Sequence, residues 1–255
     1  MTNPSDIAGS NLVARVSTGN RATLMTLATN EYDKFAALLA ALDTDDWSAM
    51  TDCPNWDVRA MASHVLGMGE MAASKREAIH QLLAARRRGG VFIDALTAVQ
   101  VHEREDMSPS QIMDRFRLVS PRAARARRQT PRLIRGRPMP VLQQVGDAQE
   151  SWTIGFLLDT VLTRDVWMHR LDISRATHRV VELTGDHDGV VVHDVVTEWA
   201  ARHGQPCHLH LNGPAGGTWD FGVAGPLIDM DAVEFCRTVG GRENLPGLMA
   251  VQVPF

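Results

Sequence analysis

The apolar residues in the first two-thirds of the chain recur at helical spacing, and this pattern restricts the fold more than any other feature of the sequence. Between positions 21 and 42 the large apolar residues fall on one side of a helix: Leu24, Leu27, Phe35, Leu38, Leu39 and Leu42. Spacings of three and four residues are typical of one face of an α-helix. Comparable segments predict helices over about 56–87, 108–128 and 147–174. Four long helices, each with an apolar side, favour an antiparallel four-helix bundle.

The sequence changes character after about Ala176, where short segments rich in β-branched residues alternate with helical ones. Strands are predicted at 180–185, 207–213, 217–223 and 247–255, and helices at 188–204 and 229–242. Interleaved strands and helices after a helical half predict an α+β protein, in which the bundle is followed by a small α/β domain. The expected parts are a flexible polar leader (1–19), the bundle (20–176) and the small domain (177–255).

Composition and charge exclude several classes of protein. The 255 residues are 44% apolar and 22% charged, as in soluble globular proteins, and the net charge of -4 argues against nucleic-acid binding by the whole molecule. No apolar run approaches the ~20 residues that span a bilayer, and the amino end lacks the pattern of a secretory signal. Cys53, Cys207 and Cys236 show neither zinc-finger nor disulfide spacing, which favours the reducing cytoplasm.

An aspartate and a histidine stand four residues apart in the predicted fourth helix, in the segment TRDVWMHRLDI. Asp165 and His169 fall on the same stripe as apolar residues such as Leu162, because residues three and four apart are neighbours on a helix. An ionised carboxylate in apolar surroundings is costly unless a cation compensates it. Two ligands at this spacing can reach one metal ion from a single helix.

His64, in the predicted second helix, offers a third ligand because it interrupts an apolar row that includes Met61 and Val65. One carboxylate and two imidazoles form the three-ligand set of catalytic zinc sites, and the same set suits non-haem iron(II). Two other interpretations stay open at this point. In one of them, His64 is a hydrogen-bonded residue of the core. In the other, Asp165 and His169 form a simple ion pair at helical spacing.

Three segments carry a resemblance to a known family. DWSAMTDCPNWDVRAMASHVLG (residues 46–67) resembles the amino-terminal signature of the mycothiol-dependent maleylpyruvate isomerase family, a branch of the DinB-like metal-binding four-helix bundles. DVWMHRLDISRAT (165–177) is similar to the second signature of that family, in which an acidic residue precedes a His-Arg-x-Asp-Ile run by four positions. LIDMDAVEFCRTVGGR (227–242) resembles its small carboxy-terminal domain, which is similar to sterol-carrier proteins.

The resemblance implies roles for individual residues. His64, Asp165 and His169 match the three ligands of the family's divalent metal, commonly zinc, although the acidic ligand is usually glutamate and Asp165 is one methylene shorter. Arg242 matches a carboxy-terminal arginine that the family places near its active site, where a guanidinium suits a substrate carboxylate. The resemblance also implies mycothiol, the low-molecular-weight thiol of actinobacteria, as the partner of the metal.

We therefore expect a metal-dependent enzyme in which the thiol is the nucleophile for isomerisation of, or S-transfer to, a small electrophile. Lowering the pKa of a thiol from its ordinary ~8.5 makes the nucleophilic thiolate available at neutral pH. The alternative is a non-catalytic, metal-containing protein that binds or carries a small ligand. A third hypothesis is a regulatory protein in which the ion only joins helices. We expect no nucleic-acid or membrane partner, and the sequence leaves the oligomeric state and substrate open.

Other candidate features are interpreted as structural. Nine arginines gather between Arg115 and Arg137, and we expect a solvated helix face and loop there, with a partner contact as the alternative. His208 and His210 alternate on one strand face, which predicts a solvent-facing side. Cys53 is expected to pack and not to act as a nucleophile, and Trp56 and Trp167 are expected to pack around the ligands.

Overall fold

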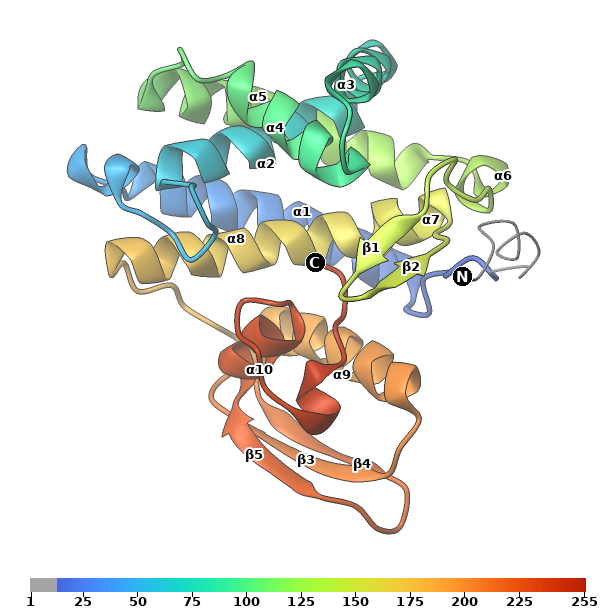
Figure 1. The fold of residues 1–255 in the computed structure, drawn as a ribbon. Helices are drawn as coiled ribbons and strands as arrows, with labels where there is room; N and C mark the ends of the chain where they lie inside the picture. The colour runs from blue at the N-terminus through green and yellow to red at the C-terminus, as the bar shows by residue number, and fades with distance from the viewer. Residues whose placement is uncertain (1–12) are drawn as a thin grey trace, which may run out of the picture.

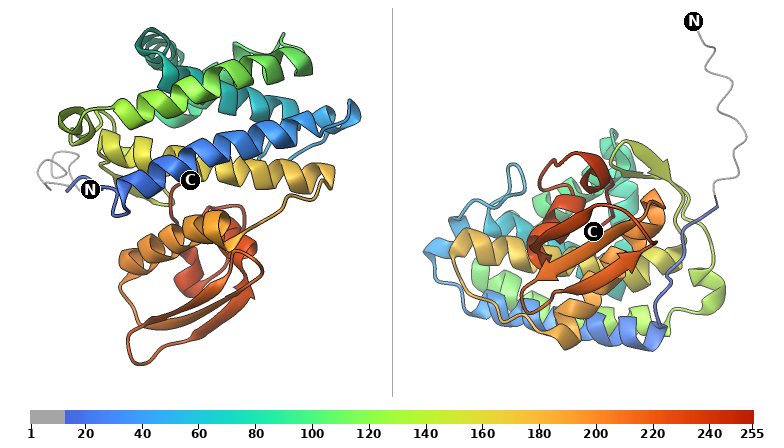
Figure 2. Two further views of the ribbon diagram at one scale, coloured as in Figure 1. Left: turned by 180° about the vertical axis from the view of Figure 1, so that it is seen from behind. Right: turned by 90° about the horizontal axis from the view of Figure 1, so that it is seen from below.

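The computed structural model describes residues 13–255, and the first part of the predicted leader, residues 1–12, lies outside them. Figure 1 shows a layer of long helices above a smaller unit with a three-stranded sheet. The views in Figure 2 show that the small unit covers one side of the helical layer. The predicted α+β class and the helical bundle are therefore confirmed. Within 13–255, none of the helices combines the length and apolarity that crossing a membrane requires.

Four long helices form the bundle: α1 (Arg21–Ala40), α2 (Val58–Ala73), α5 (Pro109–Gln129) and α8 (Leu162–Thr177). Shorter elements fill the connections: η1 (Asp45–Ser48), α3 (Lys75–Arg88), α4 (Phe92–His102), α6 (Arg132–Arg135), β1 (Gln143–Val145), β2 (Ala148–Glu150), α7 (Ile154–Phe156) and the π-helical η2 (Leu157–Val161). The core of the bundle includes Phe35, Leu66, Phe116 and Val166, each nearly inaccessible to solvent.

Two predicted helices have different limits in the structure. The second one breaks at Ser74, whose hydroxyl accepts a hydrogen bond from the Glu77 amide and so caps a separate helix, α3. The predicted fourth helix begins too early, because residues 143–150 form the antiparallel hairpin of β1 and β2. Gly146 has the left-handed φ of 57° that such a tight turn requires. The helix α4 was not predicted at all.

The small unit contains η3 (Gly185–Gly189), α9 (Val190–His203), β3 (Cys207–Asn212), β4 (Gly217–Phe221), β5 (Leu227–Asp231), α10 (Ala232–Val239) and η4 (Gly247–Ala250). β3 lies in the centre of its sheet, antiparallel to β4 and parallel to β5. The pairing of β3 with β4 confirms the prediction. The strands predicted at 180–185 and 247–255 are wrong, because β-branched residues form a strand only beside a partner. Residues 180–184 form a loop, and 247–255 consist of the 3-10 helix η4 followed by an extended chain end without a strand partner.

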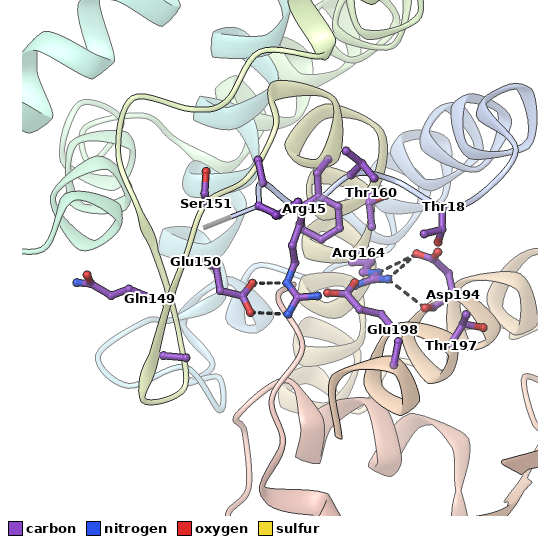
Figure 3. Close-up of a pocket in the computed structure, with 16 residues that line it drawn as sticks. Arg15, Thr18, Gln149, Glu150, Ser151, Thr160, Arg164, Asp194, Thr197 and Glu198 are labelled. Atoms are coloured by element: carbon purple, nitrogen blue, oxygen red, sulfur yellow. Dashed lines mark hydrogen bonds and ion pairs between the residues drawn. The ribbon is translucent and has the colours of Figure 1, made fainter. Parts of the chain in front are cut away.

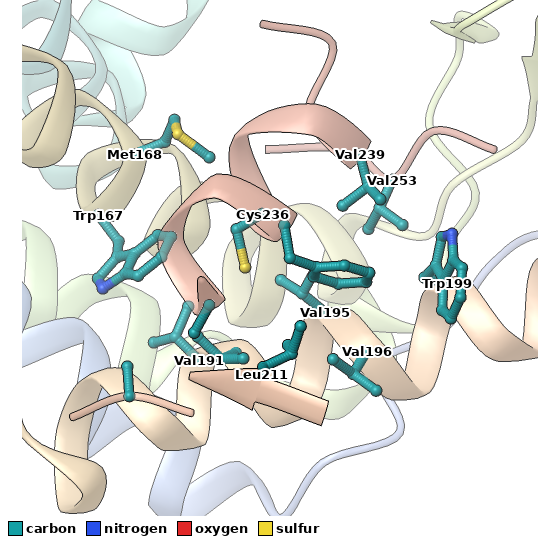
Figure 4. Close-up of a cluster of buried hydrophobic side chains, with 14 of the residues drawn as sticks. Trp167, Met168, Val191, Val195, Val196, Trp199, Leu211, Cys236, Val239 and Val253 are labelled. Carbon is teal, nitrogen blue, oxygen red and sulfur yellow. The ribbon is translucent and has the colours of Figure 1, made fainter. Parts of the chain in front are cut away.

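The helix α8 belongs to two hydrophobic cores. Val166 and Ile173 pack inside the bundle, whereas Trp167 and Met168 on the other side pack against the small unit. Figure 4 shows Trp167 and Met168 facing the valines of α9 and Cys236 of α10. Burial on both sides fixes the rotation of α8, and with it the direction in which its remaining polar side chains point.

A buried ionic network joins the two halves of the molecule. Arg170 of α8 donates to Glu31 of α1 through Nε at 2.6 Å and to Asp188 of η3 through Nη2 at 2.6 Å. His187 Nε2 lies 2.7 Å from Glu31, and the Trp167 indole donates to Asp188. Glu31, His187 and Asp188 gather as closely as metal ligands do, but the Arg170 guanidinium already supplies the cation that this cluster needs.

A second, partly buried network connects the segment before α1, the hairpin and α9. Arg15 and Arg202 both donate to the Glu150 carboxylate, and Arg164 pairs with Asp194 and Glu198 at 2.7 Å. Arg15, Glu150, Arg164, Asp194 and Glu198 line a cavity of about 550 Å³, and Figure 3 shows how they lie. These charged groups are paired with one another, so none of those that the structure describes in this lining is free for a ligand.

Removal of the Arg170 guanidinium is expected to destabilise the protein strongly. Arg170→Ala leaves two carboxylates buried without a cation, and loss of one partner of a buried pair typically costs about 3–5 kcal/mol. Urea unfolding followed by circular dichroism measures the change. The matched control is Arg125→Ala on the exposed side of α5, with an expected change below about 0.5 kcal/mol. Equal stability of the two variants would contradict the role assigned to Arg170.

The Glu150 network predicts how stability depends on pH. Burial alone would raise the pKa of Glu150, but hydrogen bonds from Arg15, Arg202 and Trp152 lower it from 4.5 to about 2. Its contribution, up to about 3 kcal/mol, is therefore complete above about pH 4.5 and is lost as the pH falls towards 2. Glu150→Gln is expected to flatten the unfolding free energy in this interval. The exposed Glu182→Gln control should keep the wild-type slope.

Candidate metal and thiol site

The structure brings together the three residues that the sequence singled out as ligands. His64 comes from α2, and Asp165 and His169 come from successive turns of α8. The Nε2 atom of His64 lies 3.6 Å from Asp165 Oδ2, and Nε2 of His169 lies 3.5 Å from Asp165 Oδ1. One atom of each side chain lies within 4.8 Å of the other two. His64 and His169 are 3% and 6% exposed, so the cluster is inside the protein.

These distances are long for hydrogen bonds and suit three ligands of one ion. Two atoms that each lie about 2.1 Å from a tetrahedral ion are about 3.4 Å apart. Asp165 Oδ2, which faces His64 Nε2, is buried and has no hydrogen-bond partner in the described part of the chain. Buried polar groups are normally satisfied. The residues present therefore fit a divalent cation held by two imidazoles and a carboxylate.

The electrostatics of the cluster point in the same direction. Burial alone would raise the pKa of Asp165, but the nearby imidazole of His169, with His64 beside it, holds that pKa well below its ordinary value. Burial would also lower the pKa of His169, yet the Asp165 carboxylate raises it well above its ordinary value. Both shifts have one cause, because an anion held in apolar surroundings draws positive charge towards itself.

The fully buried carboxylate of Asp172 lies beside His169, on the side of the ring that carries Nδ1. Oδ2 of Asp172 lies 3.5 Å from His169 Nδ1, and the same carboxylate accepts hydrogen bonds from Arg237 at 2.9 Å and from Arg242 at 2.8 Å. Burial would raise the pKa of Asp172, but His169 and Arg242 lower it to about 2. Asp172 thus links the cluster in the bundle to two arginines at the end of the small unit.

Arg242 lies beside the candidate ligands, as the resemblance implied. Asp172 and Arg237 were not identified from the sequence as site residues. Asp172 stands three residues after His169, on the same helix face, and this spacing was the available signal. Arg237 carried no comparable signal, because its contact with Asp172 depends on how the small unit packs against α8.

A cavity of about 820 Å³ opens onto the cluster. His64, Asp165, His169 and Arg242 line it together with the hairpin, α4 and the chain end from Val253 to Phe255. Figure 1 shows that this end of the chain lies between α8 and β1. The Trp56 ring stands 5.1 Å from the His64 ring and 6.0 Å from the His169 ring, between centroids. Trp56 therefore packs against both imidazoles and also forms part of the cavity wall.

The remaining sequence candidates lie apart from the cluster or at its margin. Cys53 lines the cavity, with Sγ 3.9 Å from Asp172 Oδ2. His208 and His210 are paired with Asp220 and Asp229 on the outer face of the sheet. The expectation of a fully solvated basic span is wrong for one residue. Arg127 is buried and donates to the Leu158 carbonyl and the Thr163 hydroxyl, because its long side chain fills the space between α5 and α8.

The fold is a helical bundle in which two histidines and a carboxylate on facing helices form a candidate site for a metal ion. Residues 28–174, more than half of the chain, match the family model described as the mycothiol maleylpyruvate isomerase N-terminal domain. The chain belongs to the mycothiol-dependent maleylpyruvate isomerase family.

Two solved structures are similar to this fold. They are the crystal structures of the mycothiol-dependent maleylpyruvate isomerase and of a mutant in which a histidine is replaced by alanine. Each has a TM-score of 0.57, and the similarity covers 88% of this chain and 90% of the other. Sequence identity is 16% for the first and 15% for the mutant, so the likeness concerns the fold. No curated protein matches the chain.

The buried position of Asp172 predicts a large effect on stability. Asp172→Asn removes the negative charge that Arg237 and Arg242 share, and we expect a loss of about 2–4 kcal/mol in unfolding free energy. Asp52→Asn is the matched control, because Asp52 also pairs with Arg237 but its side chain is 47% exposed. Exposed pairs contribute less than about 1 kcal/mol. Equal losses in the two variants would show that Asp172 is not the anchor of the arginines.

Proposed function

We propose that this protein is a metal-dependent enzyme that uses mycothiol as the nucleophile for isomerisation of, or S-transfer to, a small electrophile. His64, Asp165 and His169 hold the cation, and zinc is the ion that we propose. The single observation that carries the proposal is the convergence of these side chains, with unsatisfied buried atoms, at the wall of a cavity large enough for a ligand. The family membership supports mycothiol as the thiol.

We also propose the division at residues 176 and 177 and a cytoplasmic site of action. α8 ends at Thr177, which agrees with a boundary there. Cys53, Cys207 and Cys236 are free, as expected of a reduced protein.

A divalent cation lowers the pKa of a thiol that it binds, and the thiolate is then available as a nucleophile near neutral pH. The chain contributes the remaining parts of the mechanism. Arg242 presents a guanidinium to the cavity for a substrate carboxylate, while Asp172 holds it through Nε and Nη2. Asp172 also faces Nδ1 of His169 and orients that ring. Trp56 excludes water from one side of the two imidazoles.

The proposed isomerisation balances without a further reactant. The sulfur forms a bond to the alkene carbon conjugated with a carbonyl, and the π electron pair moves to the carbonyl oxygen. The former double bond is then single and rotates. When the pair returns, the carbon–sulfur bond breaks and the thiol leaves from the trans isomer. In S-transfer the carbon–sulfur bond persists, and a proton or a leaving group completes the step.

Replacement of either histidine is expected to weaken metal binding and to remove turnover. His169→Ala and His64→Ala each delete one of three ligands, so the affinity for zinc should fall at least about tenfold. Titration with zinc and elemental analysis measure the metal, and mycothiol-dependent turnover of electrophilic unsaturated keto acids, maleylpyruvate among them, measures activity. His208→Ala on the outer sheet face is the control and should retain both. Asp165→Glu should also retain metal, because glutamate supplies the same carboxylate on a side chain that is one methylene longer.

The outcomes separate the competing functions. Full zinc affinity in both histidine variants would contradict the ligand assignment. Loss of metal with unchanged binding of a small ligand, and no turnover in the wild type, would favour the carrier protein over the enzyme. A fall in melting temperature on chelation, with no thiol binding, would favour an ion that only joins helices.

A further inference from the structure

The charges of the cavity limit the substrates it can accept. Among the described residues that line it, Arg242 is the only lysine or arginine, and Asp94 and Asp165 also line it. Two nitrogens of Arg242 are already bonded to Asp172. A single carboxylate of a ligand therefore has a partner in Arg242 Nη1. With the proposed cation bound at Asp165, a second carboxylate would find no further lysine or arginine among the described lining residues, in a cavity that Asp94 also lines, and its desolvation would be costly.

The part of the cavity formed by α3 and α4 carries a group of large apolar side chains beside the polar Asp94, Thr97 and Gln100. Leu82 of α3 and Phe92, Ile93 and Leu96 of α4 line the cavity. Phe92 and Leu96 belong to a small hydrophobic cluster between these helices and α2, so the wall has its own packed support. Leu82 and Ile93 remain 39% and 42% exposed.

Large hydrophobic residues that stay partly exposed on one side of a cavity are typical of a surface for an apolar ligand group. Met68 of α2 and Leu162 and Met168 of α8 add further apolar side chains to the lining. The cavity of about 820 Å³ is in the range that buries a ligand of considerable size. A small, doubly charged substrate would leave the apolar wall uncovered.

We propose that the electrophile of this site is a molecule with one carboxylate and a bulky apolar group, such as an aryl ring. The carboxylate would bind Arg242, and the apolar group would lie against Leu82, Phe92 and Ile93. This inference rests on the proposed function for the reaction, but the shape and charge of the cavity carry it independently for binding.

Binding of unreactive probes tests the substrate class directly. β-Benzoylpropionate and levulinate each have one carboxylate and one ketone and differ in a phenyl or a methyl group, while maleate is a small dicarboxylate. Isothermal titration calorimetry of the full, zinc-loaded chain should give a dissociation constant for β-benzoylpropionate at least about tenfold below those of the other two. Equal or tighter binding of levulinate or maleate would overturn the proposal.

Variants of the apolar side chains on α3 and α4 test whether the phenyl ring of β-benzoylpropionate lies against them. The double variant Leu82→Gln, Ile93→Gln should weaken β-benzoylpropionate about fivefold or more and leave levulinate unchanged. Both positions are partly exposed, so the fold should tolerate glutamine. Leu118→Gln on α5, where Leu118 is 71% exposed and outside the cavity lining, is the matched control and should have no effect. An equal effect of the control, or none of the double variant, would contradict the placement.

Turnover separates this inference from the proposed function. β-Benzoylacrylate and β-acetylacrylate are the reactive counterparts, and each rate with mycothiol is divided by the uncatalysed rate of thiol addition. The aryl compound should have the higher kcat/KM by about tenfold. No turnover of any electrophile, with the binding preference intact, would refute the enzyme and support the substrate class. Turnover with no preference for the aryl group would support the enzyme and refute the substrate class.

Discussion

The carboxylate of Asp165, enclosed between the imidazoles of His64 and His169, is the interaction on which the chemistry of this molecule depends. It lies in a bundle whose neighbouring positions are filled by apolar side chains, and an anion there needs positive charge nearby. Both histidines turn Nε2 towards it at 3.5–3.6 Å. In the proposed function a divalent cation takes the place between the three groups, and their separations agree with a tetrahedral ion.

The position of this cluster follows from the way α8 is buried. One side of α8 packs in the bundle and the other against α9 and α10, so the helix cannot rotate without exposing one of its two apolar sides. Arg170 fixes it further to α1 and η3. Through Asp172, the same helix also holds Arg237 and Arg242 of the small unit. The orientation of His169 is thus coupled to the packing of the small unit against α8, because the Asp172 carboxylate contacts both His169 and the two arginines.

Much of the fold and part of the site could be predicted from local pattern. Helical periodicity indicated the four bundle helices, and the polar interruptions at His64, Asp165 and His169 indicated side chains that the structure places together. What could not be predicted depends on distant contacts. The buried pairing of Arg170 and the contacts of Asp172 require the small unit to be in place. Residues 147–150 of the hairpin were mistaken for the start of a helix, because a strand of three residues is recognised mainly by the strand with which it pairs.

X-ray absorption spectroscopy of the zinc-loaded protein tests the central claim most directly. The account predicts a zinc edge spectrum with two imidazole nitrogens and at least one carboxylate oxygen at about 2.0–2.2 Å, and loss of one imidazole contribution in His64→Ala. A spectrum with oxygen ligands only, or one that is identical in His64→Ala, would contradict the claim that residues of α2 and α8 hold a single ion.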